Sequence, residues 1–167
     1  MRAVISALQL SRCGFDKLLI LQKRALHFIY FSDRRDHTIP LFLNAHILPI
    51  NFMHFKLLAE TMHDVSNDLV PSNLKDLFVP TAKIHSYNTQ ASVCKNFYIQ
   101  RSNTEIQRKS LSRIGAKLWN EIPTKLRALL KAAFKKKTQM ILIKMLEHED
   151  SYKDLENIIS KGNFYSP

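Results

Sequence analysis

Glycine is scarce in this sequence of 167 residues, which contains only Gly14, Gly115 and Gly162. The loops that bind nucleotide phosphates through G-x-G-x-x-G or G-x-x-x-x-G-K motifs need closely spaced glycines, because the backbone must approach the phosphate. Glycines that lie this far apart form neither loop. The two classes of nucleotide-binding enzyme that depend on these loops are therefore excluded.

Cysteine and long apolar runs are also scarce. Cys13 and Cys94 lie far apart, and neither belongs to a C-x-x-C pair, so we predict neither a zinc ribbon nor a disulfide framework. We interpret both as reduced thiols of an intracellular protein, in the nucleus or the cytoplasm. The longest apolar runs, such as residues 18–21, fall far short of the roughly 18 residues that span a bilayer. We therefore expect no membrane-spanning helix and no membrane partner.

Acidic residues are outnumbered, since 25 Lys and Arg oppose 14 Asp and Glu, for a net charge of +11. The excess is local. Residues 101–137, here called the basic segment, hold eleven basic and two acidic residues, a net charge of +9. Phe97, Tyr98 and Trp119 lie beside or within this segment. Dense positive charge with aromatic rings is typical of surfaces that bind phosphates and stack on bases. The alternative is a solvated basic surface without a specific ligand.

Hydrophobic spacing predicts a mainly α fold of several packed helices, with a short extended or β segment around residues 80–112. We expect helices over 16–31, 40–45, 49–66 and 128–147, and a short helix after Pro71. In the first helix, Leu18, Leu21, Ala25 and Ile29 form one apolar side, which Leu26 and Phe28 widen. Residues 108–121 are interpreted as a strand that leads into a short helix, with Gly115 as the hinge. The acidic tail, residues 148–167, is expected to fray.

Candidate catalytic and metal-binding residues form no complete set. No pair of the seven histidines has the spacing of a zinc site. Asp64 and Asp68 have the i, i+4 spacing that would let a helix hold Mg²⁺, but such pairs are more often plain polar surface. Ser86 beside His85 lacks a G-x-S-x-G context. We therefore predict no catalytic residue, no metal site and no cofactor in this chain.

Six sequence blocks occur in an order that resembles a known family. They are LQKRALHFI at residues 21–29, PLF and ILPI at 40–42 and 47–50, HSYNT at 85–89, KLWNEIP at 117–123, and Phe134-Lys135. Together they resemble the region downstream of the reverse transcriptase palm in polyproteins of non-LTR (LINE-type, Jockey/CR1-like) retrotransposons. The resemblance covers residues 16–147, whereas residues 1–15 match poorly. HSYNT followed by LWNEIP is its most specific part.

The resemblance implies a thumb and post-palm region that helps to hold template RNA and primer. The polymerase aspartates would lie upstream in the palm, and no Tyr/Phe-x-Asp-Asp box occurs here. The chain is thus expected to be non-catalytic by itself and to act with the palm and fingers of a parent RNA-directed DNA polymerase. Where the family pattern usually has Arg after HSYNT, this chain has Gln90, which cannot clamp a phosphate as Arg does.

Nine side chains are the candidate contacts to RNA or DNA. The matched basic helix face, the HSYNT block and the clustered positive charge suggest Lys23, Arg24, His85, Tyr87, Arg108, Lys109, Lys135, Lys136 and Lys137. His85 and Tyr87 have the equal alternative of capping neighbouring helices, and Trp119 is expected in the core. The alternative function is a structural or interaction module whose basic surface binds acidic partners non-specifically.

Overall fold

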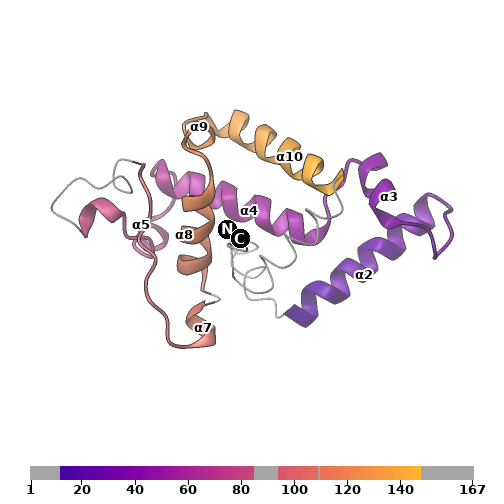
Figure 1. The fold of residues 1–167 in the computed structure, drawn as a ribbon, viewed down its shortest axis with the longest axis horizontal. Coiled ribbons are helices and arrows are strands. Elements are labelled where there is room, and N and C mark those ends of the chain that lie inside the picture. The colour runs from indigo at the N-terminus through magenta and orange to yellow at the C-terminus, as the bar shows by residue number, and fades with distance from the viewer. Residues whose placement is uncertain (1–11, 85–93, 109, 148–167) are drawn as a thin grey trace. The chain divides into compact units, whose positions relative to one another are not determined.

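The structure, a computed structural model, describes residues 12–84, 94–108 and 110–147 (Figure 1). The chain divides into two compact units. Among the described residues, the first unit comprises 12–57 and 138–147, and the second comprises the described residues of 58–137. His85, Tyr87, Lys109, Gln90 and the predicted frayed tail lie outside the described residues.

The fold is mainly α, as predicted. In chain order, the elements are α2 (Arg12–Ile29), α3 (Thr38–Asn44), α4 (Ile50–Ser66), α5 (Ser72–Lys75), the 3-10 helix η1 (Thr81–Lys83), α7 (Glu105–Arg108), α8 (Leu111–Glu121), α9 (Thr124–Arg127) and α10 (Lys131–Glu147). Pro49 directly precedes α4, where its missing N–H costs no helical hydrogen bond. The helices predicted over 40–45, 49–66 and 128–147 are therefore confirmed, with small shifts of their ends.

The extended segment around 80–112 is much reduced. Its described part contains an isolated antiparallel bridge between Pro80 and Phe97, whereas α7 and α8 occupy 105–108 and 111–121. The strand predicted from residue 108 is wrong, because these residues satisfy their backbone bonds within helices. Gly115 is not a hinge either. It lies inside α8, where an added Cβ would come 2.7 Å from Met62 Sδ and 3.2 Å from Phe78 Cε1. The glycine thus permits close approach of buried side chains.

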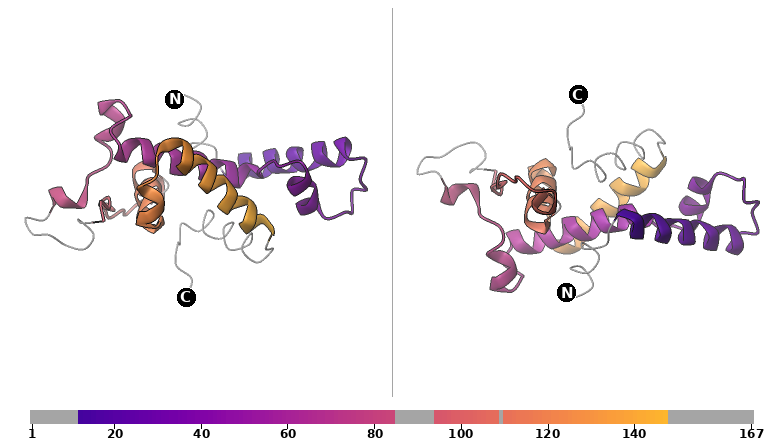
Figure 2. Two further views of the ribbon diagram at one scale, coloured as in Figure 1. Left: turned by 90° about the horizontal axis from the view of Figure 1, so that it is seen from above. Right: turned by 90° about the horizontal axis from the view of Figure 1, so that it is seen from below.

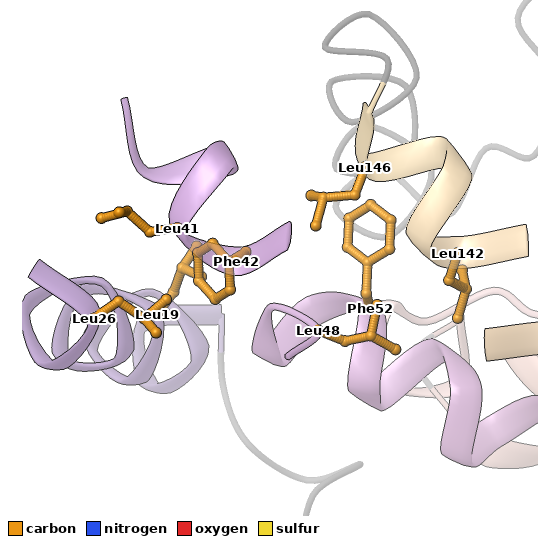
Figure 3. Close-up of a cluster of buried hydrophobic side chains, with 8 residues drawn as sticks. All are labelled: Leu19, Leu26, Leu41, Phe42, Leu48, Phe52, Leu142 and Leu146. Atoms are coloured by element: carbon orange, nitrogen blue, oxygen red, sulfur yellow. The ribbon is translucent and has the colours of Figure 1, made fainter. Parts of the chain in front are cut away.

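The core of the first unit is built from α2, α3 and the unit's parts of α4 and α10 (Figure 3). Gln22 of α2 fixes the start of α4, because its side-chain amide donates to Leu48 O at 3.0 Å and its Oε1 accepts from Ile50 N at 2.9 Å. The amide therefore spans the backbone on both sides of buried Pro49. The buried apolar side chains of this core are Leu19, Leu26, Leu41, Phe42, Leu48, Phe52, Leu142 and Leu146.

The apolar side predicted for the first helix is only partly the side that α2 buries. Leu26 of that side faces the core together with Leu19, whereas Leu18, Leu21 and Ile29 are 41%, 58% and 61% exposed. Leu19 and Leu26 are seven residues apart, so they lie almost above one another on the helix. A second apolar face on the same helix misled the assignment, because periodicity alone does not say which of two faces has a partner.

The scarcity of glycine is visible at the helix ends. Phe31, His46 and Asp68 adopt positive φ angles of 49°, 52° and 59°. The residue after each donates its N–H back to the carbonyl five positions earlier, as in the Ser32 N to His27 O bond of 3.1 Å, which is the pattern of a Schellman cap. Glycine normally takes this left-handed position. Here larger residues take it at a steric cost.

An aromatic cluster forms the core of the second unit. The His63 ring stacks on Phe134 with centroids 4.5 Å apart, and Trp119 meets His63 edge to face at 6.3 Å. Phe97 adjoins Trp119 and Phe78 at 6.4 Å and 5.7 Å. Trp119 is only 1% exposed, so its predicted role in core packing is confirmed. This core holds α8 and the start of α10 in place.

Candidate nucleic-acid interface

The lysines at the start of α10 divide into two pairs of different character. Lys131 Nζ lies 2.7 Å from Asp64 Oδ2, and Lys135 Nζ lies 3.3 Å from Glu60 Oε2. Both carboxylates belong to α4 and are mostly shielded from solvent. Phe134, between the two lysines in sequence, is 1% exposed and anchors this side of the helix in the core. The charges of Lys131 and Lys135 are thus compensated within the fold.

Lys136 and Lys137 follow on exposed positions of the same helix. Neither forms an ion pair with another described residue. Adjacent positions differ by about 100° around a helix, so their side chains spread over an arc of the surface rather than pointing at one spot. Of the predicted Lys135–Lys137 cluster, these two therefore carry the charge that no described carboxylate compensates.

Arg127, at the end of α9, is a structural residue although it belongs to the basic segment. Its Nε donates to Ile122 O at 2.6 Å, and its Nη2 donates to Asn120 O at 2.9 Å. Nη1 donates to Cys94 O at 2.9 Å and to Asn96 Oδ1 at 2.8 Å. The guanidinium also lies 5.3 Å from the centroid of the Trp119 ring. These bonds join residues 94–96 to the turn after α8.

Burial lowers the pKa of two cations in this segment. Burial is the larger effect on Arg127 and lowers its pKa. The nearby Cys94 and Glu121 act in the opposite direction and raise that pKa. Burial also lowers the pKa of Lys117, and the positive charge of Arg113 lowers it further. Half-buried Lys117 and Arg113 are thus close neighbours on α8. The described cations of the segment therefore lie at both half-buried and exposed positions.

The remaining predicted contacts occupy two units. Lys23, half-buried, and Arg24, exposed, lie on α2 in the first unit. Arg108 is exposed at the end of α7 in the second unit, to which Lys135, Lys136 and Lys137 also belong. Range 58–137 holds fourteen Lys and Arg against six Asp and Glu, so it carries a net charge of +8. Most of the chain's net charge thus belongs to the second unit.

The pair Asp64 and Asp68 does not form the helical site that its spacing indicated. α4 ends at Ser66, and Asp68 lies beyond it at the left-handed cap position. Asp64 pairs with Lys131, whereas Asp68 pairs with Lys75 at 2.6 Å. In the described ranges, no group of three or more His, Cys, Asp or Glu is arranged to hold a metal ion.

Two structural residues were not found by sequence reasoning. Asn120 accepts from Phe97 N at 3.0 Å and donates to Phe97 O at 2.9 Å, so its amide replaces a neighbouring strand. Arg127 joins residues 94–96 to the turn after α8 through its guanidinium. The available signal for Asn120 was its position directly after the buried Trp119, but its partner is 23 residues away in sequence. Nothing in the local pattern identified that partner.

No described helix combines the length and apolar character of a membrane-spanning segment. Comparison with protein-family models, characterised proteins and solved structures finds no match to this chain.

Proposed function

We propose that this chain holds the phosphate backbone of RNA or DNA and is a non-catalytic C-terminal part of a retrotransposon RNA-directed DNA polymerase. The observation that carries the binding proposal is the uncompensated charge of Lys136 and Lys137. They are exposed in a segment of net charge +9, beside two lysines already paired to α4. The polymerase origin is supported by the ordered sequence blocks.

Electrostatic binding of this kind makes a quantitative claim about salt. Each lysine that neutralises a phosphate releases about one counterion, so its loss reduces the slope of log K against log salt concentration by roughly 1. Arg127 does not contribute in the same way, because backbone and side-chain oxygens occupy four of its five N–H donors. The proposal thus separates binding cations from structural ones within a single segment.

The test is a fluorescence-anisotropy titration of labelled RNA and duplex DNA at several salt concentrations. The Lys136→Gln/Lys137→Gln double variant should weaken binding and reduce the salt slope by about 2. Lys137→Gln alone should reduce it by about 1. Lys144→Gln is the matched control, because Lys144 is exposed on the same helix but lies outside the basic segment. Equal effects of Lys137→Gln and Lys144→Gln would contradict the proposal.

The alternative is a structural module that binds acidic partners without preference. It is favoured by one observation, namely that Trp119 is buried and so contributes no stacking surface to the basic segment. Competition with poly-glutamate distinguishes the two functions. Under the alternative, poly-glutamate and unlabelled RNA displace the labelled RNA equally when they are added at the same concentration of negative charge. Under the main proposal, poly-glutamate displaces RNA much less effectively.

A further inference from the structure

The end of α2 and the turn that follows it present exposed aromatic rings. Phe28 is 81% exposed, Phe31 is 92% exposed, and Tyr30 is 39% exposed. Figures 1 and 2 show this turn between α2 and α3. The backbones of Phe28 and Phe31 are joined in the cap, because Phe31 N donates to Phe28 O at 3.4 Å. These residues belong to the first unit, apart from the basic segment.

Neither packing nor backbone conformation accounts for phenylalanine at position 31. The side chain is almost fully solvated, so it contributes little apolar burial to the fold. Its φ of 49° is a left-handed conformation that glycine adopts without strain and a bulky residue rarely adopts. His46 and Asp68 hold the same conformation in their caps, so the strain by itself assigns no function, and the exposed ring is the feature that the fold leaves without a role.

The aromatic turn is held in place by its own polar contacts. His27 Nδ1 lies 2.9 Å from Ser32 Oγ, and its Nε2 lies 3.3 Å from Thr38 Oγ1, so one imidazole joins both ends of the turn. Asp33 N donates to Asp36 Oδ2 at 2.9 Å. A turn fixed in this way presents its rings with little loss of conformational entropy when a ligand binds.

Three exposed arginines lie near the rings in sequence, together with the exposed carboxylates of Asp33 and Asp36. Arg24 precedes Phe28 by one helical turn and is exposed on the same face of α2. Arg34 and Arg35 are exposed within the turn. Flat rings flanked by guanidinium groups match a single-stranded nucleic acid, in which unpaired bases stack on the rings and phosphates meet the cations. A duplex hides its base faces and cannot use the rings.

We infer that Phe28 and Phe31 form a base-stacking platform for single-stranded RNA or DNA, with Arg24, Arg34 and Arg35 contacting the adjoining phosphates. This inference rests on the proposed function and adds a preference for unpaired strands. A second copy of this chain and an anionic bilayer are the alternative occupants of this face, and the experiment distinguishes them from a single strand.

The test compares full-length variants for binding to a labelled single strand and to its duplex. Phe28→Leu keeps an apolar helical residue but removes the ring, and Phe31→Gly removes the ring while relieving the left-handed strain. Each should weaken single-strand binding about 5-fold or more and leave duplex binding unchanged. Phe31→Gly should also raise the Tm, so that weaker binding cannot be attributed to loss of folding.

The matched control is His46→Gly, which relieves the same kind of cap at the end of α3 in the same unit. It should raise the Tm without changing either affinity. Phe28→Trp adds a direct signal, because a base stacked on an exposed indole should quench its fluorescence, whereas Trp119 is buried and supplies a constant background.

Three results would overturn the stacking platform. If Phe28→Leu and Phe31→Gly leave single-strand affinity unchanged, or weaken duplex binding equally, the rings do not stack on bases; an intact salt dependence would then leave the proposed function standing. If these variants instead change sedimentation or binding to anionic vesicles, the face serves a second copy or a membrane. If the parent chain binds no nucleic acid, both proposals fail.

Discussion

Replacing Arg127 with lysine tests whether shape or charge makes this residue important. Arg127→Lys keeps one positive charge, so a purely electrostatic role predicts little change. The structure predicts a large loss of stability, because three guanidinium nitrogens reach four oxygens on two separate segments. Lysine has its donors on a single nitrogen and cannot reproduce this planar fork.

The size of the loss follows from the bonds that lysine cannot make. At least two of the four acceptors should lose their donor, and a hydrogen bond to a charged group contributes about 1.5–3 kcal/mol. The contact with the face of Trp119 adds about 0.5–1 kcal/mol. Arg127 is only half-buried, so solvent partly replaces the missing bonds. We expect Arg127→Lys to destabilise the protein by about 2–4 kcal/mol.

Urea denaturation followed by Trp119 fluorescence measures this loss, since the single Trp of the chain adjoins Arg127 in the core of the second unit. Lys125→Arg is the control, because Lys125 is exposed two residues away and should change stability by no more than about 0.5 kcal/mol. An Arg127→Lys variant as stable as Lys125→Arg would refute the reasoning. At urea concentrations at which the Arg127→Lys variant is still folded, its slope of log K for RNA against log salt concentration should equal that of the parent chain.

Three further changes have outcomes that the structure determines. Gly115→Ala gains up to about 1 kcal/mol of helix propensity, but its Cβ would lie 2.7 Å from buried Met62 Sδ, an overlap that costs about 1–3 kcal/mol. We expect a lower Tm, and a higher one would contradict this packing. His46→Gly should stabilise the protein by about 0.5–1 kcal/mol, because relief of about 1–2 kcal/mol of left-handed backbone strain exceeds the entropy cost of glycine. An unchanged urea midpoint would contradict this expectation. Burial lowers the pKa of His54 from its usual 6.5, so the unfolded chain binds more protons and stability falls as the pH drops below about 6.5. His54→Gln should flatten this fall between pH 7 and pH 5, and an identical pH profile would show that His54 is not responsible.

Helix positions were predictable where local signals were strong. Pro49 indicated the start of α4 because proline suits the first turn, and the apolar spacing of residues 128–147 indicated α10. The fine structure around Gly115 was not predictable in this way. Its place inside α8 depends on how closely Met62 and Phe78 approach, which is a property of packing between distant residues.

The candidate site was predictable in its charge but not in its chemistry. Lys135, Lys136 and Lys137 are indistinguishable as a run of lysines, yet only Lys135 meets an α4 carboxylate, that of Glu60. The exposure of Phe28 was not predicted either, because its spacing placed it on the widened apolar side of α2, which was expected to be covered. Whether a side chain of α2 is exposed depends on the segments that pack against this helix, and these segments lie elsewhere in the chain.

The sequence by itself determined the helical character of this protein and the concentration of positive charge in residues 101–137. Both are local properties, since helical periodicity and charge density can be counted along the chain. Only the tertiary structure decided which cations remain available to a ligand. Lys131 is compensated by Asp64, 67 residues away, and Arg127 is occupied by Cys94 O, 33 residues away. Such pairings arise when distant segments pack together, and the local sequence pattern around either residue does not identify its partner.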